Sequence, residues 1–128
     1  AQQLAVIRRM TRDMSYGIEI VGCPIVREAD GLAKSSRNTY MNVAERKAAQ
    51  VLYRALQAGK NAIDSEEKDS NKITDIIQEV IDSEPMAVSV VDGITMMPAD
   101  EISDGTLIAI AVYIGKTRLI DNFTYHSR

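Results

Sequence analysis

The sequence has no tryptophan, one phenylalanine, one cysteine and one histidine among its 128 residues. So few large aromatic side chains leave no platform on which the bases of single-stranded nucleic acid could stack. A single cysteine, Cys23, excludes an internal disulfide, and no group of cysteines and histidines has metal-ligand spacing. We expect Cys23 to be a small buried hydrophobic residue rather than a reactive thiol. His126 lies close to the C-terminus, where a surface position is more plausible than a role as general base.

Long apolar runs are also missing. No stretch approaches the roughly 20 apolar residues that cross a bilayer, and the first residues lack the pattern of a signal peptide. Hydrophobic residues make up 45% of the chain and charged residues 26%, a balance that argues against disorder. We therefore expect a soluble, cytoplasmic protein with no membrane partner, folded as one compact unit.

A strong excess of positive charge is absent as well, because the formal net charge is −3. Residues 1–40 carry six basic and four acidic side chains, whereas the remainder carries nine and fourteen. Nucleic-acid binding proteins usually show a much stronger basic face. The mild positive charge of the first 40 residues favours a small anionic ligand instead.

The most informative stretch is the polar loop Asp30-Gly31-Leu32-Ala33-Lys34-Ser35-Ser36-Arg37-Asn38. Its glycine permits a bend that other residues would resist, and its serines offer hydroxyl and amide donors. Its lysine and arginine supply positive charge, so the loop has the chemistry of a polyphosphate site. Taken alone, this string is more often an ordinary solvated turn.

The flanks of the loop decide between these interpretations. The stretch from Ile18-Glu19-Ile20-Val21-Gly22-Cys23-Pro24-Ile25-Val26-Arg27-Glu28 to Thr39-Tyr40 resembles the pantothenate synthetase (pantoate–beta-alanine ligase) family. The opening Ala1-Gln2-Gln3-Leu4-Ala5-Val6-Ile7-Arg8-Arg9-Met10 and the later Thr117-Arg118-Leu119-Ile120-Asp121-Asn122 resemble the same family, in the same order. The segment 60–84 is too generic to add to this resemblance.

The resemblance implies an ATP-dependent ligase that condenses pantoate with beta-alanine through a pantoyl-adenylate, releasing AMP and pyrophosphate. It also implies that a nucleotide-binding half precedes this chain, and that the chain alone is nearly inactive. Magnesium would be held mainly by the ATP phosphates and by that other half. A different class of function stays open: a non-catalytic module that self-associates, as a homodimer for example, or a generic anion-binding α+β domain.

The resemblance also assigns roles to individual residues. Ser35 and Ser36 match the pair that contacts the ATP phosphates, and Arg37 matches the arginine that steadies them. Val26 matches a backbone contact to adenine. Lys34 completes the ATP-binding stretch, at a position where the family more often has a methionine or another long apolar residue.

The N-terminal residues predict a helix over 2–14, with apolar side chains three or four residues apart. Gln3 in this helix matches the glutamine that holds pantoate, although taken alone it would be a solvated helix residue. Ile18–Val21 predicts a short strand, which could be an orphan edge able to pair with another chain.

A second helix is predicted from Asn42, which forms a capping box with Glu45, to a stop at Gly59. Its expected buried stripe is Ala44, Ala48, Val51, Leu52 and Ala55. A third helix, capped by Ser70 or Asn71, should end near Pro85. Its buried stripe is expected to be Ile73, Ile76, Ile77, Val80 and Ile81.

Three strands are predicted over 86–91, 106–114 and 117–122, the last two joined by the turn Gly115-Lys116. The strand 106–114 is apolar on both faces, as in the centre of a sheet. The predicted class is α+β: a small antiparallel sheet of about three strands packed with helices, preceded by an orphan helix and strand from a missing Rossmann-like nucleotide-binding domain. Asp121-Asn122 should close the last strand through side-chain to backbone hydrogen bonds.

On this interpretation the chain has three parts. Residues 1–23 would be the residual end of the nucleotide-binding domain. Residues 24–40 would be the phosphate-binding loop and hinge. Residues 41–128 would form a C-terminal α+β lid domain.

Overall fold

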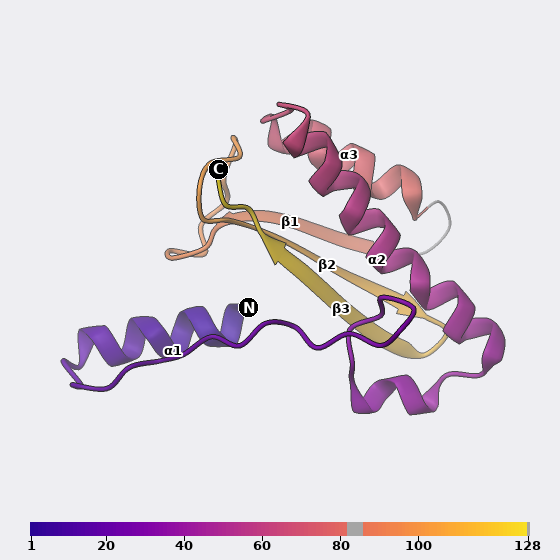
Figure 1. Ribbon diagram of the computed structural model, residues 1–128, viewed down its shortest axis with the longest axis horizontal. Helices are drawn as coiled ribbons and strands as arrows, with labels where there is room; N and C mark the ends of the chain where they lie inside the picture. Colours follow the sequence, from indigo (N-terminus) through magenta and orange to yellow (C-terminus); the bar gives the residue numbers. More distant parts are fainter. Residues whose placement is uncertain (82–85, 128) are drawn as a thin grey trace.

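The computed structural model describes residues 1–81 and 86–127. Three strands form one antiparallel sheet in the order β1-β2-β3, and α2 and α3 pack on one of its faces (Figure 1). This confirms the predicted α+β class. The elements in chain order are α1 (Gln2–Asp13), the 3-10 helix η1 (Ser36–Tyr40), α2 (Val43–Asp64), α3 (Ser70–Val80), β1 (Met86–Asp92), β2 (Thr106–Ile114) and β3 (Thr117–Thr124).

The sheet is centred on β2, as its two apolar faces predict. In the register of the sheet, Ile108 pairs with Val90 of β1, and Ile110 pairs with Asp121 of β3. The turn between β2 and β3 has Gly115 at φ +59°, a left-handed conformation that favours glycine. The predicted hairpin is therefore confirmed, although β3 continues two residues beyond its predicted end.

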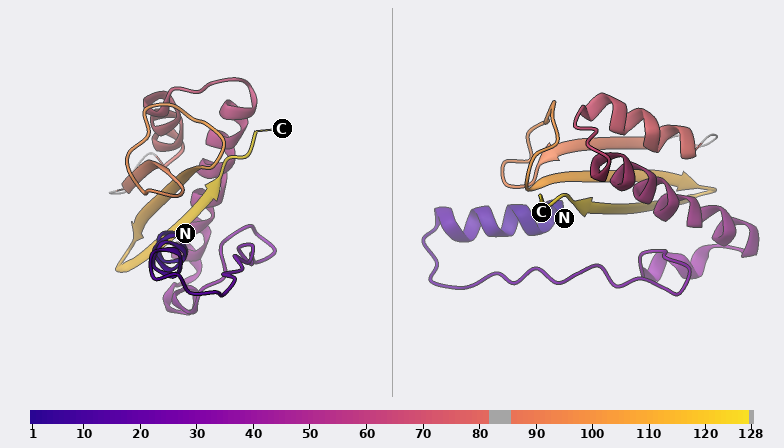
Figure 2. Two further views of the ribbon diagram at one scale, coloured as in Figure 1. Left: turned by 90° about the vertical axis from the view of Figure 1, so that its left-hand side faces the viewer. Right: turned by 45° about the horizontal axis from the view of Figure 1, so that its top comes forward.

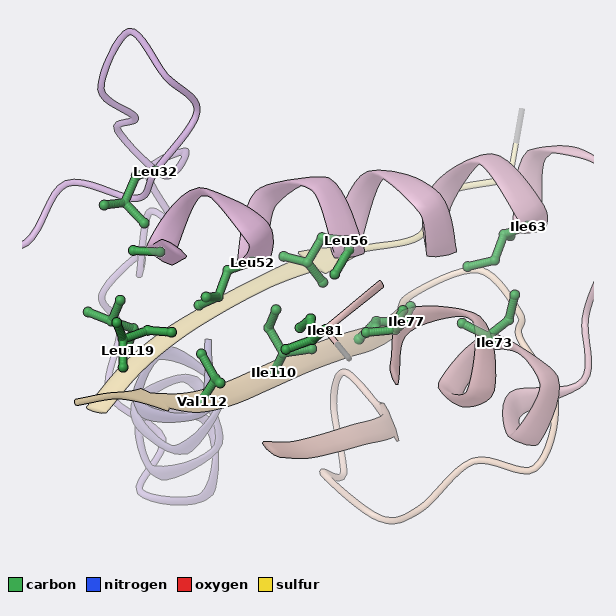
Figure 3. Packing of buried hydrophobic residues seen from close by; sticks show 14 of the residues in the cluster. Leu32, Leu52, Leu56, Ile63, Ile73, Ile77, Ile81, Ile110, Val112 and Leu119 are labelled. Carbon is green, nitrogen blue, oxygen red and sulfur yellow. The ribbon is translucent and has the colours of Figure 1, made fainter. Parts of the chain in front are cut away.

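The core lies between the sheet and the helices α2 and α3 (Figure 3). The stripe predicted for α3 is confirmed: Ile73, Ile77 and Ile81 are buried, and their neighbours Ile76 and Val80 pack against the core. The residues buried in this cluster are Leu32, Ala49, Leu52, Ala55, Leu56, Ile63, Ile73, Ile77, Ile81, Ile102, Ile108, Ile110, Val112, Ile114 and Leu119.

The observed N-cap residue agrees with the prediction at α2 but not at α3. The Asn42 side chain accepts a hydrogen bond from the Glu45 amide at 2.9 Å, and the Glu45 carboxylate accepts one from the Asn42 amide at 2.9 Å. This confirms the predicted capping box. At α3 the cap is Asp69, whose carboxylate accepts from two amides, so the prediction of Ser70 or Asn71 is wrong by one or two residues. The predicted end near Pro85 lies outside the described residues.

The predicted stop at Gly59 is also wrong, because α2 continues to Asp64. A Cβ at Gly59 would lie 2.8 Å from two side-chain carbons of Ile77. The glycine therefore serves the close approach of α3 to α2, and the burial of Ile63 beyond it offsets the cost of about 1 kcal/mol of glycine within a helix. The buried stripe predicted for α2 is right at Leu52 and Ala55, and Val51 packs against the core. It is wrong at Ala44 and Ala48, which are exposed.

The first 25 residues stand apart from this core. Helix α1 is confirmed, and it lies on the side of the sheet opposite α2 and α3 (Figure 2). The strand predicted at Ile18–Val21 is wrong: the segment belongs to no ladder among the described residues, where no strand lies alongside to pair with it. Cys23 is exposed, so the prediction that it is buried is wrong too.

Candidate functional site

The predicted phosphate loop is a narrow turn held by its own backbone. The Lys34 amide donates to the Val26 carbonyl at 2.9 Å, and the Glu28 amide donates to the Leu32 carbonyl at 2.9 Å. Gly31 lies at the tip of the turn with φ +88°. Leu32, which follows it, is only 3% exposed and packs in the core. Backbone hydrogen bonds and one buried side chain therefore define the shape of the loop.

Helix α2 holds the acidic side of this loop through Arg46. The Arg46 guanidinium donates to the Glu28 carboxylate at 2.7 Å and to the Asp30 carboxylate at 2.8 Å, and Gln50 donates to Asp30 at 3.2 Å. The hydrogen bond from Arg46 lowers the pKa of Glu28. The backbone amide of Leu32, followed by Arg46, lowers the pKa of Asp30. Both carboxylates stay ionised and keep the loop on α2.

Strand β3 holds the other side through a residue pair that the sequence did not reveal. The Arg27 guanidinium donates to both carboxylate oxygens of Asp121, at 2.6 and 3.0 Å, and to the Gly31 carbonyl at 3.0 Å. Its central carbon lies 4.8 Å from the centre of the Tyr53 ring. The hydrogen bond to Asp121 raises the pKa of Arg27. Asp121 also accepts from the Asn122 amide at 2.8 Å, the side-chain to backbone contact that the sequence predicted, although β3 continues to Thr124 instead of closing there.

The short helix η1 is capped at its N-terminus by Ser35, whose hydroxyl oxygen accepts from the Arg37 amide at 3.2 Å. Asn38 in η1 is 9% exposed and donates to the Glu28 carboxylate at 2.9 Å and to the Ala33 carbonyl at 3.1 Å. These contacts fix the backbone of the Ser-Ser-Arg string while its side chains remain exposed.

A pocket of about 250 Å³ lies between this loop and β3. Lys34, Ser35 and Arg37 line it from the loop, and residues 118–122 line it from the strand. Among the described residues, neither these two loop cations nor Arg118 has an ion pair. The only carboxylate among the described lining residues is that of Asp121, which Arg27 already neutralises. The pocket is therefore suited to an anion.

The other predicted site residues do not line this pocket. Ser36 begins η1 next to the pocket but outside its lining, and Val26 faces solvent with its carbonyl bound to the loop. Gln3 is exposed on α1, away from this pocket. Arg118 lines the pocket and was not predicted, because an arginine at the start of a strand carries no local signal of a ligand site.

Comparison with known proteins places this geometry in a family. A family model described as Pantoate-beta-alanine ligase matches residues 1–124. The chain belongs to this family. Membership rules out the alternative of an unrelated anion-binding domain.

Two curated relatives are the pantothenate synthetases of Clostridium botulinum (strain Kyoto / Type A2) and Enterococcus faecalis (strain ATCC 700802 / V583). They are 57% and 52% identical, and each match covers 98% of this chain and 46% of the relative. The chain thus spans about half the length of the curated relatives that it matches.

Solved structures of the family agree with the fold. Pantothenate synthetase from Thermus thermophilus matches with a TM-score of 0.86 and 35% identity, over 98% of this chain and 47% of that one. Pantoate-beta-alanine ligase from Francisella tularensis matches with a TM-score of 0.57 and 25% identity, over 96% and 40%. That enzyme is described as complexed with beta-gamma ATP and beta-alanine.

A metal-binding cluster and a membrane-spanning helix are both absent within residues 1–81 and 86–127. No group of three or more His, Cys, Asp or Glu side chains is placed there to hold a metal ion. Within the same ranges, no helix is long and apolar enough to cross a bilayer.

Replacing Gly31 with alanine is expected to destabilise the fold by about 2 kcal/mol. The new residue would adopt a left-handed conformation, and its Cβ would overlap the ring of Tyr53. Urea unfolding measures the loss. The control is Gly17→Ala, which has no atom within 4 Å of the new Cβ and should change stability by less than about 0.5 kcal/mol. An equal loss in both variants would contradict this account of the loop tip.

Proposed function

We propose that this chain is the phosphate-binding C-terminal part of an enzyme that condenses pantoate with beta-alanine at the expense of ATP. The observation that carries the proposal is the pocket beside β3. Lys34 and Arg37 line this pocket without an ion partner among the described residues, on the stretch that resembles the ATP-binding loop of the family. Isolated, the chain should be nearly inactive, because residues outside its span would complete the cleft.

The reaction would proceed in two steps. A carboxylate oxygen of pantoate attacks the α-phosphorus of ATP, and the bond from that phosphorus to pyrophosphate breaks. The amine of beta-alanine then attacks the carbonyl carbon of the adenylate, the bond to AMP breaks, and the amine loses a proton. The first step gathers negative charge on the departing pyrophosphate, so positioned donors and cations contribute most of the catalysis.

The loop residues fit the first step. The oxygen of Ser35 accepts from the Arg37 amide, which leaves its hydroxyl hydrogen able to donate to a phosphate oxygen. Ser36 would donate beside it, and the guanidinium of Arg37 would take up charge as pyrophosphate leaves. Val26 would contact adenine through its backbone, with Lys34 near the phosphates.

The pantoate and metal contacts lie away from this loop. Gln3 would hold pantoate from α1. The described residues offer no carboxylate cluster for magnesium, so the metal would arrive bound to the ATP phosphates.

The proposal divides the chain into three parts, one of which moves. In the proposal, residues 1–23 end a nucleotide-binding domain, residues 24–40 form loop and hinge, and residues 41–128 form a lid over the cleft. The separation of α1 from the core, with the extended segment that leads from it into residues 24–40, supports this division (Figure 1).

A chimaera tests the proposal. The part of the Clostridium botulinum relative that precedes its matched region is joined to this chain, and AMP release is measured with ATP, pantoate and beta-alanine. Turnover that requires all three substrates is expected, with none above background from the 128-residue chain alone. A folded chimaera without turnover, or robust pantothenate formation by the chain alone, would contradict the proposal.

A second candidate function is self-association without catalysis. It is favoured by apolar side chains exposed on and after α1, such as Met10 (48%), Met14 (55%), Ile18 (62%) and Val21 (70%). Sedimentation of the chain over a range of concentrations distinguishes a monomer from a self-associated form. A monomer at every concentration would exclude this candidate and leave the first untouched.

A further inference from the structure

Arg118 is held in a fixed place by the sheet. It is the second residue of β3, close to the hairpin turn, and pairs in register with Tyr113 of β2. Side chains alternate along a strand, and Leu119 and Asp121 are buried on the side toward the helices. Arg118 and Ile120 are exposed on the other side, so the position of this arginine follows from the sheet register.

This position is at the boundary between two hollows. Arg118 lines the 250 Å³ pocket beside the phosphate loop. It also lines a larger hollow of about 420 Å³ on the open face of the sheet, which extends to Ala1 and Gln2 at the start of α1. The arginine thus lies between the loop and the helix end that carries Gln3.

No neighbour among the residues that the structure describes forms an ion pair with Arg118. The carboxylate beside it, Asp121, is bound through both oxygens by Arg27. An exposed arginine elsewhere on the surface needs no partner, but this one faces a pocket that two further cations line from the opposite wall.

We propose that Arg118 is a third cationic contact for the oligophosphate bound in this pocket. It would hold the anion from β3 while Lys34 and Arg37 hold it from the loop. The inference rests on the proposed function, because it concerns the same pocket. It adds a contact from the sheet, which ties the phosphate chain to the rigid core rather than to the loop alone.

Calorimetric titration of the 128-residue chain with inorganic pyrophosphate tests this contact. Arg118→Gln is expected to weaken binding about tenfold, the effect of losing one charge-assisted hydrogen bond. Arg118→Lys, which keeps the charge but not the planar fork, should fall between that variant and the unmodified chain. The matched control is Arg54→Gln, which removes the same charge from an exposed position on α2 that lines neither of the two hollows. Its affinity should stay within about twofold of the unmodified chain.

The outcomes separate this inference from the proposed function. If Arg37→Gln weakens pyrophosphate binding but Arg118→Gln matches the Arg54 control, the third contact is wrong and the proposed function stands. If the unmodified chain does not bind pyrophosphate, the inference is overturned, because all three cations belong to this chain. The chimaera assay would then judge the proposed function independently. Unchanged thermal midpoints in the variants would show that the effects arise at the pocket rather than from unfolding.

Discussion

Arg37→Ala in the chimaera is expected to slow formation of the pantoyl-adenylate by about 10² to 10³, the usual cost of losing one preorganised group that stabilises developing charge. The guanidinium lines the pocket and has no ion partner among the described residues, so its charge is available to the leaving pyrophosphate. The measurement is the rate of pyrophosphate release in a single turnover with saturating ATP and pantoate. Beta-alanine is left out, so that only the first step is observed.

The matched control is Arg54→Ala, an exposed arginine on α2 outside the pocket. It should leave the rate unchanged. Arg37→Lys should recover part of the activity, because charge is restored without the bidentate geometry. If release proceeds at the unmodified rate in Arg37→Ala, the role proposed for this residue is wrong.

Arg27→Met is expected to lower the free energy of unfolding by about 3 kcal/mol. The side chain of Asp121 is 1% exposed, and removing its partner leaves a buried charge without compensation. Methionine keeps an apolar stem against Tyr53, so most of the loss should reflect the missing charge. Urea unfolding of the 128-residue chain measures it.

Two further variants show whether burial is the cause. Arg9→Met breaks an ion pair of the same length, 2.6 Å, between side chains that are 58% and 51% exposed, and should cost less than about 0.5 kcal/mol. The double variant Arg27→Met with Asp121→Leu should recover much of the stability, because an apolar pair needs no counterion. A double variant as unstable as Arg27→Met alone would contradict this explanation.

Local signals in the sequence predicted much of the fold correctly. The capping box at Asn42, the isoleucine stripe of α3 and the hairpin turn at Gly115 each depend on residues within a few positions of one another. The same holds for the candidate loop. Its glycine bend and its exposed serines and cations were all visible in one short run of residues, 30–38.

The wrong predictions arose where distant residues decide the outcome. Gly59 is a helix stop by local rules, but packing against Ile77 of α3 keeps it within α2. Ile18–Val21 has the composition of a strand, yet a strand forms only beside a partner, and none lies alongside in the described residues. Arg27 and Asp121 are 94 residues apart, so no local pattern could pair them. That pair brings β3 to the loop and thereby makes Arg118 part of the pocket.

Hydrogen exchange in the chimaera tests most directly whether the loop binds the nucleotide's phosphates. ATP is expected to slow exchange in peptides covering residues 34–38, whereas orthophosphate at the same concentration leaves them unchanged. Exchange in the turn after β1, at residues 93–97, should respond to neither. If ATP supports turnover while the loop exchanges as fast as in the free protein, the phosphates are bound elsewhere.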